Sequence, residues 1–150
     1  MTEPQKDFSD FMNANLGGWN TAMGLRFTKV TVDECIAEIT IGDQHRQPYG
    51  IVHGGVHTGI IEAACSTGAA MVALERKQSV VGLENSTSFI AAARSGTIRV
   101  TAVPVTRGRR TQVWEAKVTD EAGKTLATGR VRLICLDSGS EIAGQTVGQT

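Results

Sequence analysis

The segment from Val52 to Leu74, VHGGVHTGIIEAACSTGAAMVAL, constrains the fold of this chain more than any other stretch. Beyond Val56 it contains no proline and a single formal charge, Glu62. Because apolar or small residues occupy every side of a helix with this composition, we predict a long helix inside the fold. A carboxylate is rarely buried without a partner, since its removal from water is costly. Glu62 is therefore either a structural acid or a functional residue. A structural acid would reach the mouth of the core or pair with an arginine.

The residues around Glu62 favour the functional interpretation. Gly54 and Gly55 follow His53 at the predicted helix start, where they leave the first backbone N–H groups open at the positive end of the helix dipole. Such donors suit an oxyanion or a polarised carbonyl. Ser66 lies one helical turn after Glu62, on the same face, where its hydroxyl can hold a water or the carboxylate. These groups together are typical of a site for acyl-transfer hydrolysis.

The distance between the two halves of this site predicts an oligomer. Glu62 lies about 12 Å along the helix from Gly54, at about 1.5 Å per residue. One chain therefore cannot bring both groups to the same carbonyl. We predict a symmetric homodimer in which Gly54 of one subunit faces Glu62 of the other, so that the subunits share their active sites.

Composition excludes several classes of protein. The chain has 150 residues, 41% of them hydrophobic and 20% charged, which fits one soluble domain. Its 15 basic and 15 acidic residues balance, which argues against a nucleic-acid partner. Cys35, Cys65 and Cys135 are widely spaced, so we expect neither disulfides nor a zinc site, and a cytoplasmic location. We expect no signal peptide, because the first residues include acids and no apolar segment, and a helix that carries Glu62 is a poor membrane span.

The order of predicted elements indicates an α+β fold. Phe8, Phe11 and Met12 have helical spacing and predict a short helix over residues 7–15, which Gly17 and Gly18 close. Residue alternation predicts two strands before the long helix and four after it, at 24–32, 34–41, 79–92, 96–106, 111–120 and 125–136. An antiparallel sheet wrapped around the helix satisfies this order in one domain, residues 1–136. The polar tail, residues 137–150, is predicted to be disordered.

A known family shares these residues. The run from Arg46 to Gly55, RQPYGIVHGG, with Glu62 on the helix that follows, resembles the hotdog-fold acyl-CoA thioesterases. It is most similar to their 4-hydroxybenzoyl-CoA and phenylacetyl-CoA (PaaI-like) branch, and the order of elements matches from about Phe8 to Leu136. The resemblance implies hydrolysis of an acyl-CoA thioester to the free acid and CoA, with an aryl or arylacetyl group favoured and a medium-chain group open. It also implies homodimers that pair into homotetramers, no cofactor and no metal.

The resemblance assigns a role to each residue of the motif. Glu62 would be the catalytic carboxylate, either as the nucleophile or as the general base for water. Gly54 would offer its N–H to the thioester oxygen, and Gln47 would make a second polar contact near that carbonyl. Ser66 would position the carboxylate or the water. His53 would shape the turn rather than transfer protons.

Arginines are the candidates for binding the CoA phosphates. Arg107, Arg109 and Arg110 surround a glycine in a predicted hairpin that the resemblance places near the nucleotide end of CoA. Their charge and fork geometry suit phosphates, although a solvated basic turn fits the charge pattern equally well. Related enzymes often carry Arg-Pro after the strand that follows the helix, whereas this chain reads AAAR, so Arg94 is expected to replace that contact.

Other interpretations are weaker. A hotdog dehydratase acting on 3-hydroxyacyl chains needs a histidine acid/base partner in a proline-rich lead-in, which QPYG with His53 does not reproduce. A non-catalytic acyl-CoA-binding or sensing module would be expected to lack Glu62. His53 and His57 have the spacing of metal ligands but lack a third, and Cys65 is more typical of packing than of a nucleophile. Three aromatic residues suit an acyl pocket or the core, with the core favoured for the last: Tyr49, Phe89 and Trp114.

Overall fold

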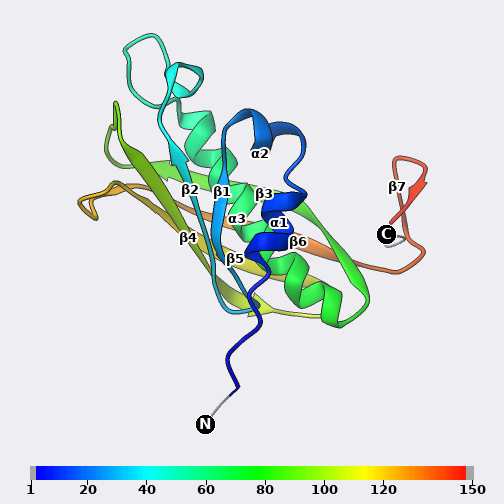
Figure 1. The fold of residues 1–150 in the computed structure, drawn as a ribbon. Helices are drawn as coiled ribbons and strands as arrows, with labels where there is room; N and C mark the ends of the chain where they lie inside the picture. The colour runs from blue at the N-terminus through cyan, green and yellow to red at the C-terminus, as the bar shows by residue number, and fades with distance from the viewer. Residues whose placement is uncertain (1–2, 148–150) are drawn as a thin grey trace.

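A computed structural model of the chain, which describes residues 3–147, has one sheet of six antiparallel strands curved around a long helix (Figure 1). The strand order is β1-β2-β4-β5-β6-β3, so β3, the first strand after the long helix, lies at an edge and pairs only with the last long strand. This arrangement confirms the predicted α+β fold. The strands are β1 (Arg26–Val30), β2 (Cys35–Thr40), β3 (Gln78–Phe89), β4 (Thr97–Arg107), β5 (Thr111–Thr119) and β6 (Thr125–Asp137).

The central helix α3 (Gly54–Glu75) is 22 residues long and mostly buried, as predicted. His53 is its N-cap, and its Nδ1 accepts a hydrogen bond of 2.8 Å from the N–H of Gly55. The small residues of α3 let the sheet approach closely. A Cβ on Gly68 would lie only 2.5 Å from the ring of Trp114, which is 0% exposed and belongs to the core, as expected.

A buried amide joins the sheet to α3. Gln112 on β5 faces the helix, donates through Nε2 to the carbonyl oxygen of Ala69 (3.1 Å) and accepts from Nε1 of Trp114 (2.9 Å). Both polar groups of the Gln112 side chain are thereby satisfied, which is the condition for burying an amide without a large cost. These bonds fix the position of β5 against α3.

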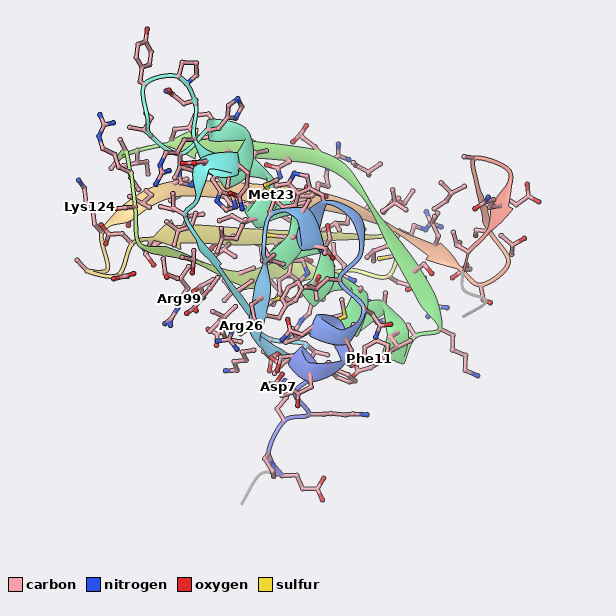
Figure 2. All side chains as sticks on the ribbon, turned by 45° about the horizontal axis from the view of Figure 1, so that its top comes forward. Asp7, Phe11, Met23, Arg26, Arg99 and Lys124 are labelled. Atoms are coloured by element: carbon pink, nitrogen blue, oxygen red, sulfur yellow. The ribbon has the colours of Figure 1, made fainter. Side chains whose placement is uncertain are left out.

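The N-terminal region packs beside α3 as two short helices. Helix α1 (Ser9–Ala14) confirms the predicted one, and Oδ1 of Asp7 holds it to β1 by accepting from the N–H of Ser9 (2.8 Å) and of Val30 (3.0 Å). Figure 2 shows Asp7 and Phe11 together in this part of the chain. Helix α2 (Gly18–Ala22) was not predicted, because the two glycines before Trp19 indicated only a helix end.

The polar tail differs from the disordered segment that its composition predicted. Strands β7 (Glu141–Ile142) and β8 (Gln145–Thr146) pair as a small hairpin after β6. Gly144, with φ of 78°, supplies the left-handed turn conformation that this tight connection requires. Residues 148–150 of the predicted tail lie outside the described residues. Within residues 3–147, the helices are too short or too polar to cross a membrane.

Candidate active site

The carboxylate of Glu62 is held by two neutral hydrogen-bond donors. Its Oε1 accepts from the hydroxyl of Ser66 (3.1 Å), as the helical spacing predicted, and its Oε2 accepts from Nδ2 of Asn85 on β3 (2.9 Å). Glu62 is half-buried and takes part in none of the salt bridges among residues 3–147. Glu62 is therefore not a structural acid paired with an arginine among the described residues.

Two residues of β3 that the sequence did not identify position Glu62. Asn85 also donates to the backbone oxygen of Thr58 (3.2 Å) and accepts from the hydroxyl of Thr87 (2.7 Å), so its amide group has one consistent orientation with the NH2 toward Glu62. A Cβ on Gly82 would lie 2.5 Å from Oε1 of Glu62, so glycine at this position lets the carboxylate lie close to the strand. The segment GLENSTSF has the pattern of a polar strand. The one feature of the sequence that could have identified this part of the site was Asn85, an amide on the side of the strand that faces the helix.

The start of α3 presents an open backbone donor. The N–H of Gly55 donates to Nδ1 of His53, so His53 caps the first turn of the helix. Among residues 3–147, the N–H of Gly54 has no hydrogen-bond acceptor. A Cβ on Gly54 would come within 2.8 Å of the ring of Phe89, so glycine allows that ring to lie close. The arrangement leaves one helix N–H free to bind a carbonyl oxygen.

Gln47 lies in the loop before α3 and lines a cavity of about 400 Å³ together with Gly54 and Phe89. Its Oε1 accepts from the N–H of Tyr49, which leaves the NH2 group as the donor available to a ligand. Tyr49 itself is 83% exposed, so within the described chain it belongs to neither the core nor a pocket.

Glu62 lies in a different cavity. That cavity measures about 430 Å³ and is lined by Glu62, Ser66, Gly59 and, from α2, Trp19. The cavity of Gly54 and the cavity of Glu62 are thus separate within one chain, as the predicted distance along α3 requires.

The three arginines of the β4–β5 hairpin do not have equal surroundings. Nη1 of Arg107 donates to Oδ1 of Asp33 (2.5 Å) and to the backbone oxygen of Val32 (3.0 Å), and this hydrogen bond lowers the pKa of Asp33. The side chains of Arg109 and Arg110 are exposed and make no hydrogen bond or salt bridge to the described residues. Arg109 and Arg110 are therefore available to a ligand, whereas Arg107 is occupied.

Arg94 lies far from that hairpin. Its Nη1 donates to the backbone oxygen of Tyr49 (2.7 Å), in the loop before α3. The hairpin instead adjoins the other end of α3, where Arg76 donates to the backbone oxygens of Arg107 (3.0 Å) and Gly108 (3.1 Å). Because 22 helical residues span about 33 Å, the predicted arginines do not form one cluster within a chain.

The remaining candidates do not support other chemistry. Cys65 is fully buried, and burial raises the pKa of its thiol, so it stays protonated and is a poor nucleophile. His57 is 3% exposed, its Nδ1 has no hydrogen-bond partner among residues 3–147, and burial lowers its pKa. In the part of the chain that the structure describes, no three potential ligands lie close enough to hold a metal ion.

Comparison with known proteins agrees with this fold. The family model described as "Thioesterase superfamily" matches residues 49–127, which include Gly54, Glu62 and Asn85. The chain therefore belongs to the thioesterase superfamily, and it is a thioester hydrolase with the hotdog fold.

Individual relatives give the same picture. A 1,4-dihydroxy-2-naphthoyl-CoA hydrolase from Listeria monocytogenes is 34% identical over 75% of this chain and 91% of its own length. The proofreading thioesterase EntH of Cronobacter turicensis is 31% identical over 73% of this chain and 79% of its own. Among solved structures, AziG of S. sahachiroi has 38% identity and a TM-score of 0.79, with 82% of this chain and 99% of that chain covered.

Proposed function

We propose that this protein hydrolyses an acyl-CoA thioester to the free acid and CoA, with Glu62 as the catalytic carboxylate. The observation that carries this proposal is the environment of Glu62, whose two oxygens are oriented by Ser66 and Asn85 while no cation among residues 3–147 neutralises them. An oriented carboxylate beside an open cavity suits a general base or a nucleophile.

The chemistry follows from the two half-sites. The thioester oxygen accepts a hydrogen bond from the free N–H of Gly54, which stabilises the negative charge that develops when the carbonyl carbon is attacked. If Glu62 is the base, it removes a proton from water, the water oxygen bonds to the carbonyl carbon, the C–S bond breaks, and the thiolate of CoA takes up the proton. If Glu62 is the nucleophile, its oxygen forms a mixed anhydride as the C–S bond breaks and the thiolate of CoA leaves. Water then hydrolyses the anhydride to the free acid and the Glu62 carboxylate, and the proton released from water goes to the thiolate.

A homodimer would assemble these half-sites. Gly54 and Glu62 lie in separate cavities of one chain, and the outer edge of β3 has no partner strand within the described residues. Leu83 and Phe89 of β3 are large exposed apolar residues, and an unpaired apolar edge strand is normally covered in a native protein. We infer that two subunits pair along β3 with α3 helices running in opposite directions, so that Gly54 faces the partner's Glu62. A dimer of dimers remains our prediction for the full assembly.

An aryl group is the acyl group that we favour. The relative from Listeria acts on 1,4-dihydroxy-2-naphthoyl-CoA, a bicyclic aryl thioester, and it aligns with most of this chain. The CoA half would be held by Arg109 and Arg110, whose side chains are free among the described residues, and Arg94 remains a candidate at the other end of α3. A reducing cytoplasmic compartment fits the three free, buried cysteines.

The experiment that tests this function is release of free thiol from aryl-, arylacetyl- and medium-chain CoA thioesters by the wild type and by Glu62→Gln. We expect turnover by the wild type, fastest with an aryl ester, and a loss of at least about 100-fold in kcat for the variant, since positioned acid–base groups contribute on the order of 100- to 10,000-fold. The variant should keep its circular dichroism spectrum and its affinity for CoA. Turnover unchanged in Glu62→Gln would refute the assignment, and no turnover by the wild type would refute the function.

A further inference from the structure

The indole of Trp19 lies directly against the helix that carries Glu62. A Cβ on Gly59 would lie 2.4 Å from both Cζ2 and Cη2 of Trp19, so the ring contacts the bare backbone of α3 one turn before Glu62. Trp19 remains 41% exposed and lines the same cavity as Glu62 and Ser66. It is therefore the aromatic wall of the cavity in which the proposed reaction takes place.

The wall of this cavity that adjoins the indole is flat. Gly55, Gly59 and Ala63 follow one another at intervals of four residues, so they share one face of α3, and all three line the cavity. No side chain larger than a methyl group projects from this stripe. A smooth helix surface beside an indole suits a planar group better than a flexible one, because a planar group contacts both surfaces without losing rotational freedom.

Trp19 is held in place by the end of its helix. The carbonyl oxygen of Met23, the residue after α2, lies 2.8 Å from Nε2 of His45, and Nδ1 of His45 accepts from the N–H of Gly42 (2.8 Å). Because Nδ1 accepts, Nε2 carries the proton and donates to Met23. His45 is fully buried, so this link anchors α2 to the body of the domain and makes the Trp19 wall preformed.

We propose that Trp19 contacts the acyl group of the substrate and selects planar aromatic acyl groups over aliphatic ones. This inference rests on the function proposed for Glu62 and adds a specificity-determining residue to it. A contact between aromatic rings contributes roughly three- to tenfold in binding beyond the area that it buries. A flexible aliphatic chain gains no such term from the indole.

The first test compares benzoyl-CoA with hexanoyl-CoA as substrates for the wild type, Trp19→Phe and Trp19→Ala. We expect Trp19→Ala to lower kcat/KM about tenfold for benzoyl-CoA and less than about twofold for hexanoyl-CoA, with Trp19→Phe between the wild type and Trp19→Ala. Equal losses for the two esters, or no loss, would overturn the proposal. If the wild type hydrolyses neither ester, the function proposed for Glu62 fails instead, so the two failures are distinguishable.

Fluorescence supplies a second test that does not depend on turnover. The chain has two tryptophans, and Trp114 is 0% exposed in the core, so a change of emission on ligand binding reports Trp19. We expect benzoyl-CoA to change the emission of Glu62→Gln and to leave that of the double variant Glu62→Gln, Trp19→Phe unchanged. Gly59→Ala, whose methyl group would displace the indole, should reproduce the selectivity of Trp19→Ala. Binding of benzoyl-CoA to Glu62→Gln, shown by equilibrium dialysis, without a change of emission would contradict the contact.

Discussion

Asn85 donates its side-chain N–H to the carboxylate of Glu62 across 2.9 Å, and the same nitrogen donates to the backbone oxygen of Thr58 across 3.2 Å. The edge strand β3 is thereby fastened to α3 at the helical turn that carries Glu62. A neutral donor orients the carboxylate and leaves its charge in place, whereas a lysine or an arginine at this position would neutralise it. The strand is therefore part of the proposed active site as well as the edge at which we expect the subunits to pair.

The first prediction concerns this amide. Asn85→Asp replaces the donor with a second carboxylate about 3 Å from Glu62, and two carboxylates at that distance do not readily ionise together. We expect kcat at pH 7 to fall by at least about tenfold and the acid limb of the pH–rate profile to move to higher pH. Ser86→Asp is the matched control, because the neighbouring residue lines the outer face of the sheet. The same pH profile in both variants would contradict a positioning role for Asn85.

The second prediction separates the arginines. Arg109 and Arg110 are free among the described residues, so replacing both with alanine should raise KM for an acyl-CoA roughly three- to tenfold and leave kcat nearly unchanged, as expected for a contact remote from the reacting bond. Arg107→Ala should instead lower the urea midpoint of unfolding, since it removes the bonds to Asp33 and Val32. The pantetheine thioester, which lacks the nucleotide, is the control. An equal rise in KM with that substrate would exclude phosphate binding.

The third prediction concerns stability at mildly acidic pH. Burial lowers the pKa of His57 in the folded protein, whereas the pKa of a histidine in an unfolded chain is about 6.5. Between these values the unfolded state binds the additional proton, so the stability contributed by neutral His57 is complete above pH 6.5 and is lost as pH falls through the folded pKa. The urea midpoint of the wild type should therefore fall more between pH 7.5 and 5.5 than that of His57→Gln. Identical falls would show that His57 is not kept neutral by burial.

Much of this fold could be predicted because its patterns are local. The apolar run of α3 and the alternation of the strands specify their elements, and Glu62 stands out as the charge within that run. The pairing of Ser66 with Glu62 also follows from helical spacing alone. Helix α2 could not be predicted, because Gly17 and Gly18 indicate a break and its stability comes from packing of Trp19 on Gly59 and from the anchor at His45.

The part of the site that the sequence did not reveal depends on strand register. Asn85 reaches Glu62 only because β3 pairs with β6 and carries an irregularity between Gly82 and Glu84, which sets the side that each later residue faces. The three arginines of the β4–β5 hairpin also look alike in the sequence. Only the fold shows that Arg107 is bound to Asp33 while Arg109 and Arg110 are free among the described residues.

The fourth prediction isolates the backbone donor of Gly54. Gly54 is the first residue of α3, where proline is tolerated, and His53 before it has the extended conformation (φ −63°, ψ 135°) that proline requires. Gly54→Pro removes the N–H without ending the helix and should lower kcat on the order of 100-fold, as loss of one oxyanion donor does. Gly54→Ala meets the ring of Phe89 in the same way but keeps the N–H, so it should retain most of the activity. Equal losses in both would show that crowding, and not the donor, matters.

The most direct test of the account mixes the two inactive chains. Glu62→Gln and Gly54→Pro subunits carrying different tags are co-expressed, the heterodimer is purified on both tags, and release of thiol from an aryl-CoA is measured. If Gly54 of one subunit acts with the partner's Glu62, the heterodimer has one intact site and one doubly defective site, so about half of the wild-type kcat per dimer should return. A heterodimer as inactive as either parent would show that both groups act within one chain, and the shared site would have to be abandoned.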